Sequence, residues 1–199
     1  MGCGKSSVGK RLSELLCCRF MDLDEVIVGR AGRSIPEIFA EDGEGEFRRM
    51  EKEALKSILA TDGPTLILAL GGGAVMQEEC EEMVHSETLC IYLRASVETL
   101  VERLTGEADG RPLLAGADAG KSSQTAGTSC GPSVMSSEVE TSALGQRILK
   151  LMSARSETYE RVAHIIIDTD GKSIKEVAEE IADQLSASTS SQKISPIFP

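Results

Sequence analysis

The sequence has no long hydrophobic segment. None of its uninterrupted apolar stretches is longer than residues Leu66 to Leu70, whereas a helix that spans a membrane needs roughly 20 consecutive apolar residues. The N-terminus carries no apolar segment of the kind found in signal peptides. Both absences predict a cytosolic protein with no membrane partner.

Positive charge is also scarce. The 199 residues include 21 Lys and Arg against 32 Asp and Glu, which gives a net charge of −11 and a pI near 4.8. Proteins that bind DNA or RNA usually present a basic surface to the phosphates. A nucleic-acid partner is therefore not expected.

Cysteine occurs without the patterns that bind metals. The six cysteines form no C-x-x-C pair and have no histidine close by in the sequence, so they are expected to be reduced thiols that act as small apolar residues. A chain of this length can bury a sizeable core by itself and needs neither disulfides nor a structural metal. One compact domain is the expectation.

Short apolar runs alternate with helical patterns along the chain. Continuous apolar runs, typical of buried parallel strands, cover residues 19–23, 65–70, 88–93 and 164–168. Apolar residues at helical spacing cover residues 4–16, 46–60, 96–104 and 173–185, and a serine opens each of the last two. This alternation predicts an α/β protein with a mostly parallel, doubly wound sheet.

Two polar segments are expected to lie outside this fold. Residues 115–143 are rich in Ser, Gly, Thr and Ala, so they bury too little apolar surface to offset their conformational entropy. Residues 186–199 are similarly polar and end in Pro-Ile-Phe-Pro. We predict one domain over residues 1–185 that contains a flexible insertion at 115–143, followed by a disordered tail.

A phosphate-binding pattern opens the chain. Gly4-Lys5-Ser6 matches the last three positions of the G-x-x-x-x-G-K-[ST] loop, in which the lysine reaches the β- and γ-phosphates and the hydroxyl binds Mg²⁺. The first glycine of that pattern would precede residue 1. The same residues also fit an N-myristoylation signal starting at Gly2, with Cys3 as a palmitoylation site, and this alternative stays open.

Acidic and glycine residues follow two of the expected strands. Asp22 and Asp24 stand at the end of the first, where ligands of open α/β sheets bind. They either point to one face of the strand, one toward Mg²⁺ and one toward a substrate hydroxyl, or they cap the next helix. Residues 71–73 are three glycines, which either bring backbone amides close to a ligand or make a tight turn.

Cations are spaced along the chain in positions that suit anionic ligands. Arg48 lies beside the apolar stripe of a helix, Arg111 precedes the polar insertion, and Arg155 lies on the helix that follows it. Each taken alone is compatible with an ordinary surface residue. Together with Lys5 they are the charges that a nucleotide and an acidic substrate require.

The order of these motifs resembles the shikimate kinase family of small P-loop kinases. The motifs are G-K-S, D-L-D, S-I-P-E-I-F, F-R-R-M-E, G-G-G-A-V, R-P-L-L, R-x-x-x-Y and D-T-D. The resemblance implies a three-layer α/β/α domain that uses MgATP to phosphorylate the 3-hydroxyl of shikimate in aromatic amino-acid biosynthesis, as a cytosolic monomer. A gluconate-type kinase and a non-catalytic nucleotide- or shikimate-binding remnant are the alternatives.

The resemblance also implies a role for each motif. The ATP phosphates would lie against Gly2, Cys3, Gly4, Lys5, Ser6 and Ser7. Ser6 and Asp22 would hold Mg²⁺, and Asp24 would bind the reacting hydroxyl. The shikimate carboxylate and ring would contact Arg48, Arg155, Gly72 and Gly73. Arg111 would close over the transferred phosphoryl group, and Arg103 is a weaker candidate for contact with adenine.

The sequence departs from the family at its start. The family begins with a central apolar strand and the first P-loop glycine, and neither precedes Gly2 here. Losing five or six buried strand residues would remove on the order of 8–18 kcal/mol, so poor folding and a start further upstream are expected. Residues 194–199 are not expected to replace this strand, because prolines interrupt them.

Overall fold

The computed structural model describes residues 2–105, 134–188 and 196–198. None of the helices in these ranges is long and apolar enough to cross a membrane. In chain order the elements are α1 (Lys5–Leu15), β1 (Arg19–Asp22), α2 (Leu23–Ala31), α3 (Ile35–Glu41), α4 (Gly43–Leu59), β2 (Leu66–Ala69), η1 (Ala74–Met76), α5 (Glu78–Glu87), β3 (Leu89–Arg94), α6 (Val97–Thr105), α7 (Val134–Val162), β4 (Ile165–Asp168), α8 (Ile174–Ser188) and β5 (Pro196–Phe198).

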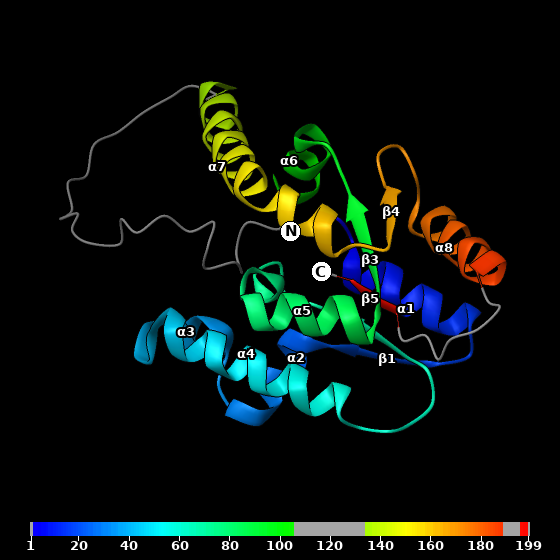
Figure 1. Ribbon diagram of the computed structural model, residues 1–199. Coiled ribbons are helices and arrows are strands. Elements are labelled where there is room, and N and C mark those ends of the chain that lie inside the picture. Colours follow the sequence, from blue (N-terminus) through cyan, green and yellow to red (C-terminus); the bar gives the residue numbers. More distant parts are fainter. Residues whose placement is uncertain (1, 106–133, 189–195, 199) are drawn as a thin grey trace.

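The strands form one parallel sheet in the order β1-β2-β5-β3-β4 (Figure 1). Four of them coincide with the four predicted apolar runs, and the expected α/β class is confirmed. Because side chains alternate across a strand, Cys90 and Tyr92 of β3 belong to one apolar cluster while Ile91 and Leu93 belong to the other. The sheet therefore separates two cores.

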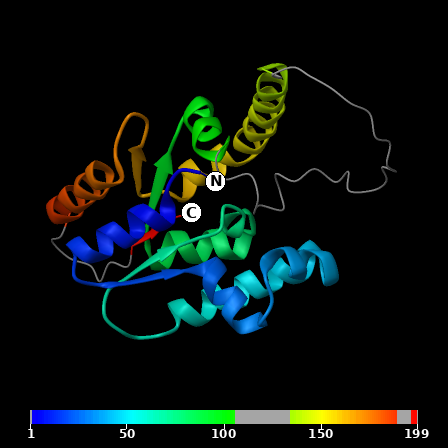
Figure 2. The same ribbon diagram turned by 180° about the vertical axis from the view of Figure 1, so that it is seen from behind.

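Helices cover both faces of the sheet. One cluster contains side chains of α2, α4 and α5, and the other contains side chains of α1, α6 and α8 (Figure 1 and Figure 2). Helix α7 contributes to both, through Ile148 on one face and Tyr159 on the other. This is the expected three-layer arrangement, with the carboxyl ends of β1 and β2 and the start of α1 along one edge.

Local capping sets where several helices begin. The Ser96 hydroxyl accepts a bond from the Thr99 N–H at 3.2 Å, and the Ser173 hydroxyl accepts one from the Glu176 N–H at 3.3 Å. Both serines were expected as caps. Ser34 forms a full capping box with Glu37 at the start of α3, which satisfies two backbone donors of that short helix.

Several helices were not predicted. The apolar pattern did not indicate α3, which has seven residues, too few for a 3.6-residue apolar stripe to stand out. Helix α2 was indicated only by the capping alternative for Asp22 and Asp24. Helix α5 was missed because most of its residues are charged or polar. Of the predicted insertion at 115–143, the part from Val134 onward lies in α7, and residues 115–133 lie outside the described residues.

The C-terminal segment corrects two predictions. Instead of a disordered tail over 186–199, residues 186–188 continue α8, and Pro196–Phe198 forms β5 between β2 and β3. The argument that proline bars this segment from the sheet is also wrong. Pro196 takes the first position of the strand, where its missing N–H is tolerated, and the Phe198 side chain is fully buried. The centre of the sheet is thus occupied.

Candidate active site

The N-terminal loop leads directly into helix α1. Gly2 and Gly4 have positive φ angles of 66° and 84°, a conformation that residues with a side chain rarely adopt. No side chain caps α1. The first-turn N–H groups therefore bind no N-cap side chain, and they can donate to an anion. Lys5, Ser6 and Ser7 of this first turn line a cavity.

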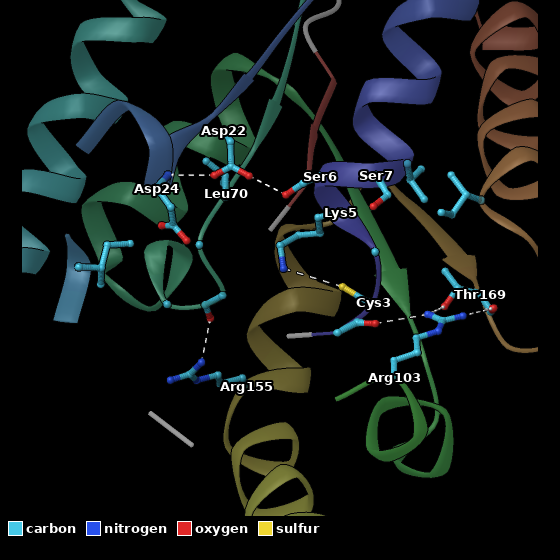
Figure 3. A pocket seen from close by; sticks show the side chains of 18 of the residues that line it. Cys3, Lys5, Ser6, Ser7, Asp22, Asp24, Leu70, Arg103, Arg155 and Thr169 are labelled. Atoms are coloured by element: carbon cyan, nitrogen blue, oxygen red, sulfur yellow. Dashed lines mark hydrogen bonds between the residues drawn. The ribbon is translucent and has the colours of Figure 1, made fainter. Parts of the chain in front are cut away.

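The positive charge of Lys5 lies beside Cys3 within this loop. The Lys5 ammonium lies 3.8 Å from the Cys3 sulfur (Figure 3). Burial raises the pKa of the Cys3 thiol, but the positive charges of Lys5 and of the N-terminus, together with backbone N–H groups, lower it by more, so that the pKa falls from 9.0 to about 7. An environment that stabilises a thiolate also stabilises phosphate oxygens.

Ser6 and Asp22 meet at the edge of the same loop. The Ser6 hydroxyl donates to Asp22 Oδ2 at 2.6 Å, and Asp22 Oδ1 accepts from the Asp24 N–H at 3.0 Å (Figure 3). Asp22 is the N-cap of α2 and Asp24 lies in its first turn, so the helix-capping interpretation of this pair is confirmed. A hydroxyl and a carboxylate oxygen side by side fit the hard-oxygen ligands that Mg²⁺ prefers.

Asp24 approaches the end of β2 through a glycine. A Cβ atom added to Gly71 would lie 2.9 Å from Asp24 Oδ1 and 2.9 Å from Glu51 Oε1. The two carboxylates therefore flank one backbone position, and a side chain at Gly71 would have to displace them. Glu51 Oε1 is buried and has no hydrogen-bond partner among the described residues, which makes it an acceptor aimed at this part of the cavity.

Arg48 is held by acids of its own helix. Its Nη1 donates to Glu51 Oε2 at 2.7 Å, and its Nη2 donates to Glu44 Oε1 at 3.1 Å. Glu51 is 1% exposed, and burial raises the pKa of its carboxyl although Arg48 opposes that shift. The buried carboxylate orients the guanidinium, whose remaining N–H groups can meet an anion.

Arg155 and Tyr159 fix the glycine loop from the other side. Arg155 Nη1 donates to the Gly72 carbonyl at 3.1 Å (Figure 3), and the Tyr159 hydroxyl donates to the same oxygen. Both side chains come from α7, one turn apart. A carbonyl that accepts two bonds is strongly fixed, so the neighbouring backbone is held in one orientation.

Arg103 connects the phosphate loop to the far end of the cavity. It donates to the Gly2 carbonyl at 3.5 Å, to the Thr169 hydroxyl at 3.2 Å and to the Thr169 carbonyl at 3.0 Å (Figure 3). The resemblance made this arginine only a weaker candidate, for contact with adenine. The structure places it at the cavity wall, next to the loop that follows β4.

One cavity of about 970 Å³ brings nearly all the predicted site residues together. It is lined by Gly2, Cys3, Gly4, Lys5, Ser6, Ser7, Asp22, Asp24, Arg48, Gly72, Gly73, Arg103 and Arg155. The remaining candidate, Arg111, lies outside the described residues. In Figure 3, Lys5 and Ser6 of the phosphate loop lie between Asp24 and Arg155 on one side and Arg103 and Thr169 on the other.

Sequence reasoning missed some of the cavity wall. Glu51 and Thr169, which line the cavity, were quoted in motifs without a role of their own, and so was Tyr159, which holds the Gly72 carbonyl. Ile35, Phe39 and Phe47 add an apolar wall. The signal for Glu51 was its place on the buried stripe of α4 beside Phe47 and Ala54, where a carboxylate is rare unless it is paired.

A methyl group at Gly73 tests this geometry. Its Cβ would overlap the Arg48 guanidinium, the flexible end of a side chain, so the fold tolerates Gly73→Ala by moving Arg48. We expect weaker binding of an acidic ligand by about tenfold, the value of one charge-assisted hydrogen bond, with little change in Tm. Gly45→Ala on α4 is the control, since nothing lies within 4 Å of its Cβ. Equal affinities for both variants would contradict the contact.

Comparison with known proteins agrees with this site. The family model "Shikimate kinase" matches residues 1–186. A shikimate kinase of Thermus thermophilus is 38% identical over 185 residues, which cover 93% of this chain and 85% of that protein. A shikimate kinase of Geobacter sulfurreducens is 40% identical over 182 residues, covering 92% of this chain and 84% of that protein.

Solved structures match as well. Shikimate kinase from Acinetobacter baumannii, determined in complex with shikimate, has a TM-score of 0.76 and 29% identity, and the match covers 96% of this chain and 91% of that one. Shikimate kinase from Aquifex aeolicus has a TM-score of 0.67 and 28% identity, with 94% and 92% covered. The family model and these relatives show that the chain belongs to the shikimate kinase family.

Proposed function

We propose that this protein transfers the γ-phosphoryl group of ATP to the 3-hydroxyl of shikimate, which yields ADP and shikimate 3-phosphate in the synthesis of aromatic amino acids. The observation that carries the proposal is the single cavity in which a glycine-turn phosphate loop faces Asp24, Arg48 and Arg155. Phosphoryl transfer needs positioning and charge neutralisation more than covalent chemistry. A site of this composition supplies both.

The nucleotide end is formed by residues 2–7. Backbone N–H groups of the loop and the start of α1 bind the phosphate oxygens, and Lys5 neutralises the charge that builds up on the γ-phosphoryl oxygens. Ser6 and Asp22 would hold Mg²⁺, which supplies further charge neutralisation between the phosphates. Arg103 lies where the rest of the nucleotide would extend, beyond Gly2.

The acid-binding end is formed by α2, α4, α7 and the glycine loop at residues 71–73. The Asp24 carboxylate accepts the hydrogen bond of the reacting hydroxyl and takes its proton as the phosphoryl group arrives. Arg48 and Arg155 bind the substrate carboxylate, and the Gly72 and Gly73 backbone contacts the ring hydroxyls. Arg111, outside the described residues, would add a cation over the transferred group.

The direct test is ADP release with and without shikimate. We expect ADP release from MgATP to depend on shikimate and to be absent with gluconate, which distinguishes the proposal from a gluconate-type kinase. Isothermal titration with MgATP and shikimate on the same preparation identifies the non-catalytic alternative. Binding of both ligands without ADP release would contradict the proposed reaction.

The carboxylate contact predicts a selective defect. Arg155→Lys keeps the charge but loses the planar fork that binds a carboxylate through two bonds. We expect the KM for shikimate to rise about 10- to 100-fold while the KM for ATP changes less than about threefold, because Arg155 lies at the acid-binding end of the cavity. Arg161→Lys on the same helix, exposed and paired with Glu81, is the control. Equal increases in both KM values would refute the assignment.

We also propose that the protein works as a monomer in the cytosol, where ATP is abundant. The residues proposed for both ligands come from one chain and line one cavity. Kinetic constants that do not change with protein concentration, together with a monomeric mass in solution, would support this.

A further inference from the structure

The shortest strand occupies the centre of the sheet. β5 lies between β2 and β3 and is parallel to both (Figure 1). Its backbone pairs Ile197 with Leu68 on one side and with Cys90 on the other. Leu68 and Cys90 are fully buried, and buried strand edges that lack a partner are costly. β5 therefore supplies backbone hydrogen-bond partners to both β2 and β3.

Phe198 is joined to the loop at the acid-binding end. Its carbonyl accepts a hydrogen bond from the Leu70 N–H at 2.6 Å. Leu70 directly precedes Gly71 and the rest of the glycine loop that faces Asp24, and it lines the cavity itself. This bond fixes the point at which the chain leaves β2 and turns into the ligand-binding loop.

Phe198 also belongs to the apolar cluster that includes part of the phosphate loop. Its side chain is fully buried in the apolar cluster that contains Cys3 of the loop and Val8 and Leu12 of α1. In both views β5 runs beside the start of α1 (Figure 1 and Figure 2). The Phe198 ring therefore lies in the same apolar core as the base of the nucleotide end.

We infer that Phe198 is a positioning residue for both ligand sites: its carbonyl holds the start of the Gly71–Gly73 loop and its ring supports the phosphate loop. The inference rests on the proposed function for the identity of the two ligands. A residue that touches neither ligand then controls the distance between the two sites. Misplacing reacting groups by an ångström slows a reaction by about a hundredfold.

The test compares two cavity-forming substitutions in the 199-residue chain. Phe198→Ala and Ile181→Ala both remove a fully buried side chain from the same cluster, and each is expected to lower Tm by roughly 5–20 °C. Ile181 lies on α8, away from the cavity. We expect Phe198→Ala to raise the dissociation constants of both MgATP and shikimate by about tenfold or more, and Ile181→Ala to change each less than about twofold.

The conservative variant Phe198→Leu should restore both affinities to within about threefold of the unmodified chain, because an apolar side chain of similar size refills the cluster. Amide hydrogen exchange provides a readout that needs no ligand. The Leu70 N–H should exchange slowly in the unmodified chain and about tenfold or more faster in Phe198→Ala, whereas Ile181→Ala should leave it slow under native conditions.

Two results would overturn the inference. Fast exchange of the Leu70 N–H in the unmodified chain would show that β5 does not hold this position. Equal loss of affinity in Phe198→Ala and Ile181→Ala would show that Phe198 contributes only to the stability of the fold and does not position the ligand sites. Failure of the proposed function is recognised separately, by absence of shikimate-dependent ADP release from the unmodified chain while the Leu70 N–H remains protected.

Discussion

Asp24→Asn should lower kcat for shikimate phosphorylation by about 10²–10⁴-fold, the range expected when a general base is lost. Asparagine keeps the size and most of the polarity of aspartate but carries no charge and takes up no proton. The KM for ATP should change little, because the phosphates bind at the other end of the cavity. Initial rates of ADP release at saturating shikimate measure the effect.

The same substitution should not destabilise the fold. Burial raises the pKa of the Glu51 carboxyl, and the nearby negative charge of Asp24 raises it further. Removing that charge relieves the repulsion between the two carboxylates, so Tm is expected to stay the same or to increase. A loss of activity without a loss of stability is typical of a residue kept for chemistry.

Asp183→Asn is the matched control. Asp183 is an exposed residue of α8 that does not line the cavity, and its substitution should leave both kcat and Tm unchanged. If Asp24→Asn retained more than about a tenth of the rate, proton transfer to this carboxylate would not be the step it assists, and Glu51 would become the next candidate acceptor.

The sequence predicted those parts of the site whose residues lie close together in one sequence motif. Lys5 and Ser6 follow each other in a phosphate motif, and Asp22 and Asp24 follow a continuous apolar run, so local patterns were enough to place them. The pairing of Glu51 with Arg48 was also visible as a three-residue spacing. The place of Glu51 on the apolar stripe of α4 was the only signal of its burial, and its position beside Gly71 carried no signal, because Gly71 comes from a different element.

The centre of the sheet could not be predicted in the same way. Strand patterns are recognised over four or more residues of alternating or continuous apolar character, whereas β5 has three residues and begins with proline. Its stability comes from partners on β2 and β3, more than 100 positions earlier in the chain. Local propensity carries no information about such contacts, and tertiary packing overrides it here.

The second large effect is expected at Lys5. Lys5→Met keeps an unbranched side chain of similar length but removes the charge that faces the phosphates. We expect kcat/KM for ATP to fall by about 10²–10³-fold, the loss seen when one preorganised donor to developing charge is removed. Lys10→Met is the control, because Lys10 is an exposed residue of the same helix outside the cavity.

A second measurement tests the geometry behind this prediction without any turnover. The positive charge of Lys5 contributes to lowering the pKa of the Cys3 thiol to about 7. Without that charge the pKa of Cys3 should move up toward 9.0. At pH 7.5 the thiolate fraction of Cys3 should then fall, and the rate of its alkylation by iodoacetamide should fall with it. Lys10→Met should leave the pH dependence of Cys3 alkylation unchanged. The buried thiol of Cys90, whose pKa is raised to about 12, should stay unreactive in all variants. An unchanged Cys3 profile in Lys5→Met would mean that Lys5 does not set the potential of the phosphate loop, and a large kinetic defect would then need another cause.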